Sequence, residues 1–242
     1  GLVLNLHALS SGSSQLRLRL RDYRFDGPLI WTLLKIGIPA SVTDLQRGLS
    51  RLAVIGIVAS FGATAVAAFT LARRAELVAM QAGQAIGRAA GALAGQNLGA
   101  HLPERAKMSV WWATAYVGLT SLVLTLLILA FPIQIASFIN GDPAFIDTAA
   151  PWLRVIALGY FAVAGVFVLV NTLNSTGQTI VPMIVALTLT WGVEIPLAFT
   201  LPRFTSLDHM GIPWAILVGT TIRFIILAWY VSRGRWLRTG VI

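Results

Sequence analysis

The sequence predicts an all-α membrane protein in which six transmembrane helices form one bundle. The chain has 242 residues, of which 57% are hydrophobic and only 11% charged, and its mean hydropathy is +0.79. Soluble domains carry about a quarter charged residues, so a soluble core of this size cannot hide so much apolar surface. Several apolar stretches also exceed the roughly 20 helical residues that cross a bilayer. Composition and run length therefore both place the chain in a membrane.

Six apolar stretches follow one another along the chain, and turn-forming residues separate them. The predicted spans are residues 29–60, 63–99, 108–131, 148–173, 179–202 and 211–232. Asn140-Gly141-Asp142-Pro143 and Asn174-Ser175-Thr176-Gly177 are typical turn sequences between spans. We therefore expect three parts. These are a cytoplasmic loop at residues 1–27, a six-helix transmembrane lobe at 28–235 and a cytoplasmic tail at 236–242.

The distribution of basic residues predicts the orientation of the bundle. With both ends in the cytoplasm, nine basic residues flank the inner ends of the spans, namely Arg17, Arg19, Arg21, Arg24, Arg105, Lys107, Arg233, Arg235 and Arg238. Only Arg154 and Arg203 lie toward the outer ends. Lys and Arg prefer the cytoplasmic side of a membrane. We therefore expect a multi-pass plasma-membrane protein with both ends of the chain in the cytoplasm. Attraction of the loop at 1–27 to anionic lipid headgroups explains the net charge of +9 without nucleic acid as a partner.

The sequence offers no catalytic or metal-binding pattern. It contains no cysteine, and His7, His101 and His209 are too far apart in sequence to form a zinc-ligand spacing. Neither a nucleophile elbow nor a phosphate-binding loop is present. We therefore expect a protein that is not an enzyme and has no cofactor. Any active transport would draw on an ion gradient, with H⁺ or Na⁺ as the coupling ion.

The second span carries a stripe of glycines, and two spans contain an interior proline. Gly83, Gly87, Gly91, Gly95 and Gly99 recur at every fourth position. They lie on one face of a helix, where a neighbouring helix can approach closely. The stripe fits either a sliding surface or static packing. Pro39 and Pro196 each remove a backbone hydrogen bond and are expected to kink their helices.

Charged side chains inside the spans are the most informative feature. These residues include Asp44, Arg47, Arg51, Arg73, Arg74, Glu76, Arg88, Glu194 and Arg223. A charge at the bilayer centre costs at least about 2.5–3.5 kcal/mol. These side chains must therefore face one another or a cavity that contains water.

The embedded carboxylates have two interpretations, which the sequence leaves open. A carboxylate in a cavity can exchange a proton, or attract Na⁺ or a cationic substrate. Alternatively, Asp44–Arg47 and Arg73–Glu76, each three residues apart, are permanent structural ion pairs. Glu194 has no basic residue within four positions, and its place near Pro196 is compatible with a depth close to the outer surface.

Two amides supply a weaker signal between the fourth and fifth spans. Asn171 and Asn174 could contact substrate, or they could close a turn, since asparagine is an ordinary turn residue. Both residues are therefore candidates for substrate contact.

Several short motifs resemble one family of transporters. The most specific are Gly95-Gln96-Asn97-Leu98-Gly99-Ala100 and the following Pro103-Glu104-Arg105-Ala106. Gly37-Ile38-Pro39-Ala40-Ser41, Val58-Ala59-Ser60-Phe61-Gly62 and Arg74-Ala75-Glu76 precede them. This series resembles the seventh and eighth helices of multidrug and toxic compound extrusion (MATE) transporters.

The resemblance implies a larger assembly and an activity. It implies one lobe of a twelve-helix fold in a bacterial inner membrane, with residues 1–27 linking the lobes. An N-terminal lobe of similar size would be its partner. Small-molecule substrates, typically organic cations or amphipathic drugs, would leave in exchange for H⁺ or Na⁺. Asp44, Glu76 and Glu194 would bind ion or substrate, Arg47 and Arg73 would pair with them, and Asn171 and Asn174 would contact substrate.

The chain departs from the family pattern at three positions, which leaves the coupling ion and the substrate charge open. Arg47 stands about where some branches carry a glutamate, Gln178 where many relatives carry an aspartate, and Glu194 where many carry a basic residue. A lipid-linked saccharide flippase of related architecture is one alternative, and Arg47, Arg51, Arg73 and Arg74 facing inward would favour it. An inactive half-transporter or membrane scaffold is the other.

Overall fold

The computed structural model describes residues 26–238, and nearly all of them are helical. The chain divides into two units, residues 1–35 and 36–242, and the start of helix α2 belongs to the first. Most of the predicted loop at 1–27 lies outside the described residues. The helices are α2 (Gly27–Ala59), α3 (Ala63–Gly99), α4 (Pro103–Ala130), α5 (Pro132–Ile139), α6 (Pro143–Ala157), α7 (Tyr160–Ser175), α8 (Ile180–Leu189), α9 (Ile195–Phe204) and α10 (Gly211–Ser232), with short helical turns η2 (Thr190–Glu194), η3 (Asp208–Met210) and η4 (Arg235–Arg238).

The helices match the six predicted spans closely, and the fold class is confirmed for the described residues. Within residues 26–238, three segments are long and apolar enough to cross a membrane, namely Pro103–Ala130, Ile180–Phe204 and Asp208–Ser232. The pair α6 and α7 also qualifies as one span, although it is bent by 47°. Helices α2 and α3 have ample length at 33 and 37 residues, but both carry the charged side chains discussed below.

Two features of the spans were not predicted. The fourth span is broken at Leu158-Gly159 instead of running straight. The short helix α5 fills the first half of the predicted connection between the third and fourth spans. Proline explains both helix starts in this connection, since Pro132 and Pro143 occupy the first helical turn, where a missing N–H costs nothing. Asp142 also caps α6 by accepting a hydrogen bond from the Ala144 amide at 3.2 Å.

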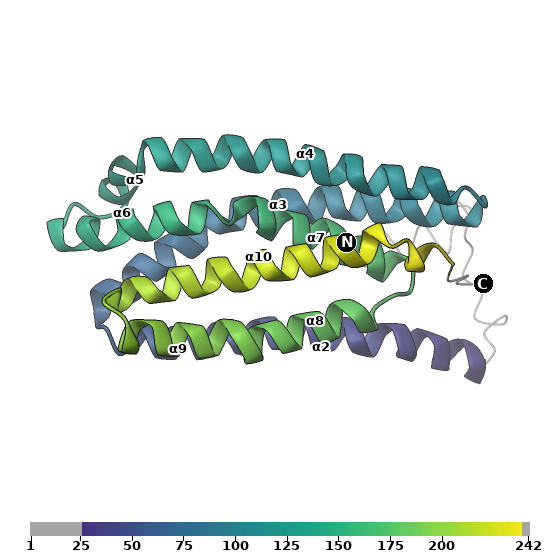
Figure 1. The fold of residues 1–242 in the computed structure, drawn as a ribbon, viewed down its shortest axis with the longest axis horizontal. Helices are drawn as coiled ribbons and strands as arrows, with labels where there is room; N and C mark the ends of the chain where they lie inside the picture. The colour runs from purple at the N-terminus through teal and green to yellow at the C-terminus, as the bar shows by residue number, and fades with distance from the viewer. Residues whose placement is uncertain (1–25, 239–242) are drawn as a thin grey trace, which may run out of the picture. The chain divides into compact units, whose positions relative to one another are not determined.

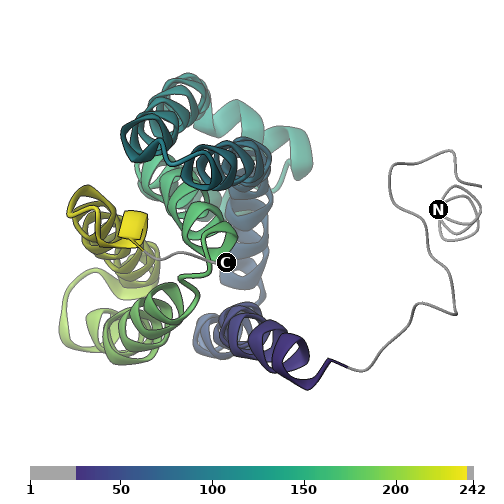
Figure 2. The same cartoon turned by 90° about the vertical axis from the view of Figure 1, so that its right-hand side faces the viewer.

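Helix α3 packs against α7, α4 and α6, while α10 packs against α9 and α7. In both ribbon views α4 runs alongside α3, and α8 and α9 run alongside α10 (Figure 1, Figure 2). The core between these helices contains the fully buried Trp152, whose ring lies 6.1 Å from that of Phe69. The Trp152 indole donates a hydrogen bond to Nδ1 of His209 at 3.2 Å. The start of the predicted tail also packs on the bundle, because Trp236 is buried and donates to the Val231 carbonyl.

The glycine stripe marks the contact between α3 and α7. A Cβ atom on Gly83 would lie 2.7 Å from the Ala164 carbonyl oxygen, and one on Gly87 2.9 Å from that of Phe167. A Cβ on Gly91 would overlap the Ser175 side chain, whereas one on Gly95 meets only the Ser175 carbonyl at 3.9 Å. Close approach is thus confirmed for the first three glycines, and the stripe is a packing surface in this structure.

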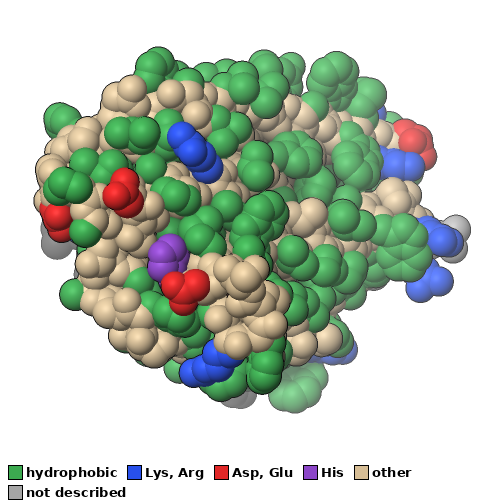
Figure 3. All heavy atoms as spheres, turned by 60° about the vertical axis from the view of Figure 1, so that its left-hand side comes forward, with side chains coloured by type: hydrophobic (Ala, Val, Ile, Leu, Met, Phe, Trp, Pro, Cys, Tyr) green, Lys and Arg blue, Asp and Glu red, His purple; other side chains and the backbone are tan. Residues whose placement is uncertain are grey.

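The outer surface is apolar, as a lipid-facing surface must be. Leu119, Leu122, Leu126 and Trp112 on α4 are each more than half exposed. Figure 3 shows one face of the molecule, on which apolar side chains predominate and charged side chains are few. Within the spans, Glu76 is buried and four charged residues are partly buried, namely Arg47, Arg73, Glu194 and Arg223. Asp44, Arg51, Arg74 and Arg88 are exposed.

Candidate functional site

An ion pair between two spans lies at the centre of the candidate site. Arg223 on α10 donates from Nη2 to Oε2 of Glu194 at 3.2 Å and to the hydroxyl of Thr190 at 2.5 Å. Both charged side chains are less than a fifth exposed. Gly219 makes room for the pair, since a Cβ there would lie 2.9 Å from Cβ of Glu194. The Glu194 side chain faces α10, and its depth close to the outer surface of the membrane stays a prediction.

A short π-helical turn orients the side chains of Glu194 and Thr190 toward α10. Residues Thr190–Glu194 form a π-helical turn between α8 and α9, in which the Ile195 amide bonds to the Thr190 carbonyl five residues earlier. Pro196 follows directly and has no N–H to continue the regular pattern. The predicted irregularity at Pro196 is thus a π-bulge, a feature often found at functional sites.

A second ion pair lies on α3. Arg73 donates from Nη1 to Oε2 of Glu76 at 2.5 Å, and the Glu76 side chain is only 5% exposed. The guanidinium of Arg73 also lies over the Phe69 ring, 5.8 Å from its centre, within the range of a cation–π contact. The expected pairing at i, i+3 is present, and it is buried.

The two buried pairs face one cavity of about 80 Å³. Helices α2, α3, α7 and α10 and the π-turn η2 enclose it. Its lining residues are Gln46, Arg47, Ser50, Arg73, Glu76, Met80, Val163, Val166, Phe167, Thr190, Glu194, Thr220 and Arg223. We call it the inner cavity. Four of the predicted site residues, Arg47, Arg73, Glu76 and Glu194, therefore come together here.

The remaining predicted residues line a neighbouring cavity of about 420 Å³, which we call the outer cavity. Its lining residues are Asp44, Arg47, Gln84, Arg88, Phe167, Val170, Asn171 and Asn174. Arg47 and Phe167 line both cavities, and the Arg47 guanidinium lies 5.0 Å from the centre of the Phe167 ring. This cation–π contact stands where the two cavities meet.

Asp44 differs from the two buried carboxylates. It pairs with Arg47 at 3.0 Å, but its side chain is 75% exposed. Exposed pairs of this kind contribute little stability. The Asp44 carboxylate is thus accessible to a ligand in the outer cavity.

Asn171 and Asn174 belong to α7, and the backbone carbonyl of Asn174 closes the turn after this helix by accepting a hydrogen bond from the Gly177 amide at 3.1 Å. The turn is made by Thr176 and Gly177, and Gly177 has a φ of 78° that favours glycine. The Asn171 amide donates to the Phe167 carbonyl at 2.8 Å. Asn174 Oδ1 is buried and has no hydrogen-bond partner among the described residues. The turn-closing role is therefore confirmed for Asn174 through its backbone, and it is wrong for Asn171, whose side chain bonds within α7.

Sequence reasoning did not include Arg223, Thr190 or Gln46 among the candidates. Arg223 was noted as a charge in the sixth span, but its partner lies 29 residues away, a separation that reveals no pairing. Gln46 lies two residues from Asp44 and is buried. Its burial next to charged residues is visible only in the structure.

The arginines that would favour a flippase are only partly turned inward. Arg47 and Arg73 line the inner cavity, and Arg51 lines a small crevice of about 10 Å³ beside Arg73 and Glu194. Arg74 is exposed. Within residues 26–238, no group of three or more His, Asp or Glu side chains is placed to hold a metal ion.

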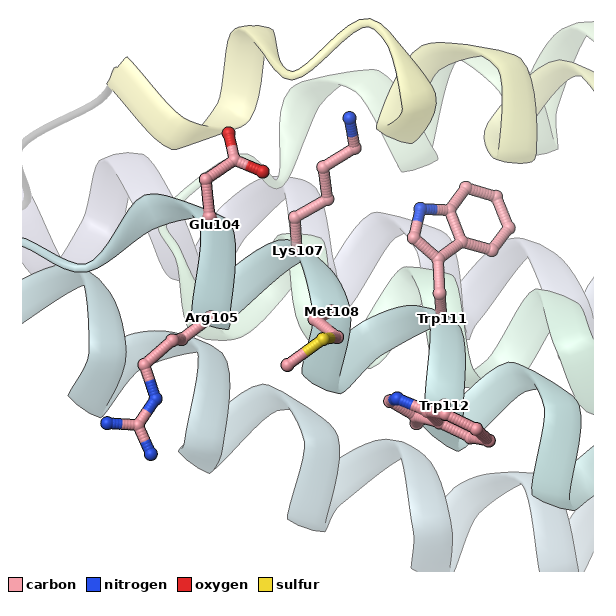
Figure 4. Close-up of a pocket in the computed structure, with 6 residues that line it drawn as sticks. All are labelled: Glu104, Arg105, Lys107, Met108, Trp111 and Trp112. Carbon is pink, nitrogen blue, oxygen red and sulfur yellow. The ribbon is translucent and has the colours of Figure 1, made fainter.

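A separate surface groove of about 420 Å³ runs along the start of α4. It is lined by Glu104, Arg105, Lys107, Met108, Trp111 and Trp112. Figure 4 shows Glu104, Lys107 and Trp111 directed to one side of the helix, with Arg105 and Trp112 on the other. Basic and tryptophan side chains at a span end are typical of residues at the headgroup level of a membrane. The groove contains none of the predicted site residues.

The comparisons with known proteins agree with this geometry. The family model described as MatE matches residues 39–200, which include α3 to α8 and most of α2. The chain belongs to the MatE family. This family consists of membrane transporters involved in multidrug efflux and not of enzymes, as the resemblance implied.

Relatives of this MatE protein carry names that fit the family. It is 28% identical over 195 residues to "Probable multidrug resistance protein YoeA" of Bacillus subtilis, covering 79% of this chain and 42% of that one. It is 27% identical over 243 residues to "Probable multidrug resistance protein NorM" of Burkholderia pseudomallei, covering 96% and 50%. The chain spans about half the length of these relatives.

Solved structures show the same fold. The "Crystal structure of MATE in the bent conformation" superposes with a TM-score of 0.89 at 17% identity, covering 98% of this chain and 53% of that one. The fold of this MatE chain therefore corresponds to one half of that transporter.

Proposed function

We propose that the chain is one lobe of a secondary active exporter, which moves amphipathic organic compounds, including organic cations, outward in exchange for H⁺ or Na⁺. The second lobe would be a six-helix bundle of similar size, since relatives are about twice as long as this chain. We place the transporter in the bacterial plasma membrane with both ends of the lobe in the cytoplasm. The basic flanks at Arg105, Lys107, Arg233 and Arg235 support this orientation.

One observation carries the proposal, namely two buried Glu–Arg pairs on one cavity within membrane spans. Buried pairs rarely add stability, because desolvation offsets the attraction between the charges. Their retention inside spans is typical of ion and substrate pathways. When a proton or Na⁺ occupies one carboxylate, the arginine beside it loses its partner. Ion binding can thus change the packing between α10 and the π-turn η2.

Exchange requires that the ion and the substrate compete. A carboxylate cannot hold a proton and a substrate cation at the same time, so each lowers the affinity for the other. Asp44 is accessible in the outer cavity, and Glu76 and Glu194 line the inner one. We assign the competition to these three carboxylates.

A flippase for anionic lipid-linked saccharides is the second candidate. The inner cavity has three arginines against two glutamates, and this excess favours an anionic group. Its volume of about 80 Å³ is small for a saccharide headgroup. The exporter therefore remains the proposed function.

Neutralising the carboxylates should stop coupled efflux. The complete transporter is placed in vesicles loaded with ethidium, a fluorescent cation, and the H⁺ and Na⁺ gradients are collapsed in turn. We expect the efflux of ethidium to depend on one of the two gradients. Each of the variants Asp44→Asn, Glu76→Gln and Glu194→Gln should reduce the efflux rate to that of ethidium-loaded vesicles without protein. The matched control is Asp147→Asn, since Asp147 is an exposed carboxylate of α6 outside both cavities. Full gradient-dependent efflux in all three variants would remove the role assigned to these carboxylates.

A further inference from the structure

Basic side chains without a carboxylate partner gather at one end of the bundle. Arg105 and Lys107 belong to the first two turns of α4 and line its surface groove. Arg233 and Arg235 lie at the end of α10 and in η4, which packs against α4. Within the part of the chain that the structure describes, none of these four residues makes an ion pair. Glu104 is the one acidic residue of the groove lining, so positive charge predominates there.

Aromatic and apolar side chains form the rest of the groove. Met108 and Trp112 are more than half exposed, and Trp111 is partly exposed. Lys107 and Trp111 point to one side of α4 and Trp112 to the other (Figure 4). An indole joins an apolar ring to an N–H donor, which suits the boundary between lipid headgroups and tails. The volume of about 420 Å³ is within the range of small-ligand sites.

An exposed apolar stripe continues from the groove along α4. Its members lie three, four or seven residues apart and therefore share one face of the helix, namely Met108, Trp112, Tyr116, Leu119 and Leu126. Each of them is more than half exposed, and the rings of Trp112 and Tyr116 lie 6.1 Å apart. A ligand with an anionic head in the groove would therefore find apolar surface for a long hydrocarbon tail.

We propose that the groove at the start of α4 binds the phosphate of an anionic phospholipid, whose acyl chains lie along the stripe. Guanidinium, ammonium and indole N–H groups all donate to phosphate oxygens, and basic pockets at span ends bind anionic lipid headgroups. A zwitterionic phospholipid brings its own cation, which Arg105 and Lys107 repel. A soluble phosphate gains nothing from the stripe. The site lies outside both cavities, so it does not depend on the exporter function.

Binding is tested on the purified complete transporter in micelles of an uncharged detergent. The protein is titrated with phosphatidylglycerol, with phosphatidylcholine of the same acyl chains, or with glycerophosphate, which has the anionic head but no tail. Ionic strength is held constant. A ligand that binds only the folded state raises the Tm by mass action. We expect phosphatidylglycerol to raise the Tm in a concentration-dependent manner, and the other two ligands to leave it nearly unchanged.

Three double variants locate the effect. Arg105→Gln with Lys107→Gln should weaken the binding of phosphatidylglycerol by about tenfold or more, so that the same rise in Tm needs correspondingly more lipid. Arg105→Lys with Lys107→Arg keeps both charges and should retain most of the binding. Arg154→Gln with Arg203→Gln is the matched control, since it removes two charges from exposed side chains of α6 and α9 outside the groove. This control should bind as the unchanged protein does.

Equal stabilisation by phosphatidylglycerol and phosphatidylcholine would overturn the proposal. Equal stabilisation by glycerophosphate would also overturn it, because it would indicate a site for free phosphate. Equal losses in the groove variant and the matched control would trace the effect to the charge of the whole protein and not to the groove. A Tm that phosphatidylglycerol leaves unchanged would show that lipid does not occupy the groove in the complete transporter.

Discussion

Replacement of Arg223 by glutamine should destabilise the protein by about 3–5 kcal/mol, because it leaves Glu194 buried without its cation. The predicted effect is large because both side chains are less than a fifth exposed and Thr190 also loses its hydrogen bond from Arg223. The free energy of unfolding of the purified protein in detergent micelles, measured by denaturant titration, gives the value directly.

A double variant separates this explanation from simple loss of packing. Glu194→Gln combined with Arg223→Gln removes both charges and should recover most of the lost stability, since two amides can hydrogen-bond to each other. Asp44→Asn provides the control, because the exposed Asp44–Arg47 pair should contribute at most about 1 kcal/mol. A double variant as unstable as the single one would mean that the buried charge is not the cause.

Adding one methyl group to the glycine stripe should have the next largest effect. We expect Gly83→Ala and Gly87→Ala each to destabilise the protein by about 1–3 kcal/mol, since the new Cβ would meet backbone atoms of α7 that cannot move aside cheaply. Thermal unfolding in nanodiscs and the yield of monodisperse protein would both report the change.

Gly95→Ala is the matched control within the same helix and the same stripe. Its new Cβ would have only an ordinary contact at 3.9 Å, and alanine is the better helix former by about 0.5–1 kcal/mol. We therefore expect no loss of stability and a small gain. Equal destabilisation at Gly83 and Gly95 would contradict the packing assigned to α3 and α7.

The positions of the spans could be predicted from the sequence, and so could ion pairs between residues that are close in the chain. Long apolar runs and turn residues predicted the helices to within a few residues at most ends, because both signals are local. The pair Arg73–Glu76 was also predicted, since its spacing of i, i+3 places both side chains on one helix face. All seven candidate residues line one of two adjoining cavities, although their roles stay predictions.

Contacts between spans that are far apart in the chain could not be predicted from the sequence. Arg223 reaches Glu194 and Thr190 only because α10 packs beside the π-turn, and tertiary packing of this kind has no periodic signal. The bend between α6 and α7 escaped prediction because the two helices read as one continuous apolar run. The importance of Gln46 follows from its burial at the inner cavity and from no motif.

The proposed exchange requires that ionisable side chains within the spans face a cavity that water can reach. The chain contains no cysteine, so single cysteines can be placed on an unreactive background. Ser50 lines the inner cavity, whereas Leu126 is 57% exposed on the apolar surface of α4. Each residue is replaced by cysteine in a separate variant. The variant proteins are placed in nanodiscs and treated with sulfonatoethyl methanethiosulfonate, an anionic reagent that does not enter lipid. We predict modification of the Ser50→Cys protein and none of the Leu126→Cys protein, and an unreactive Ser50→Cys protein would contradict a water-accessible site.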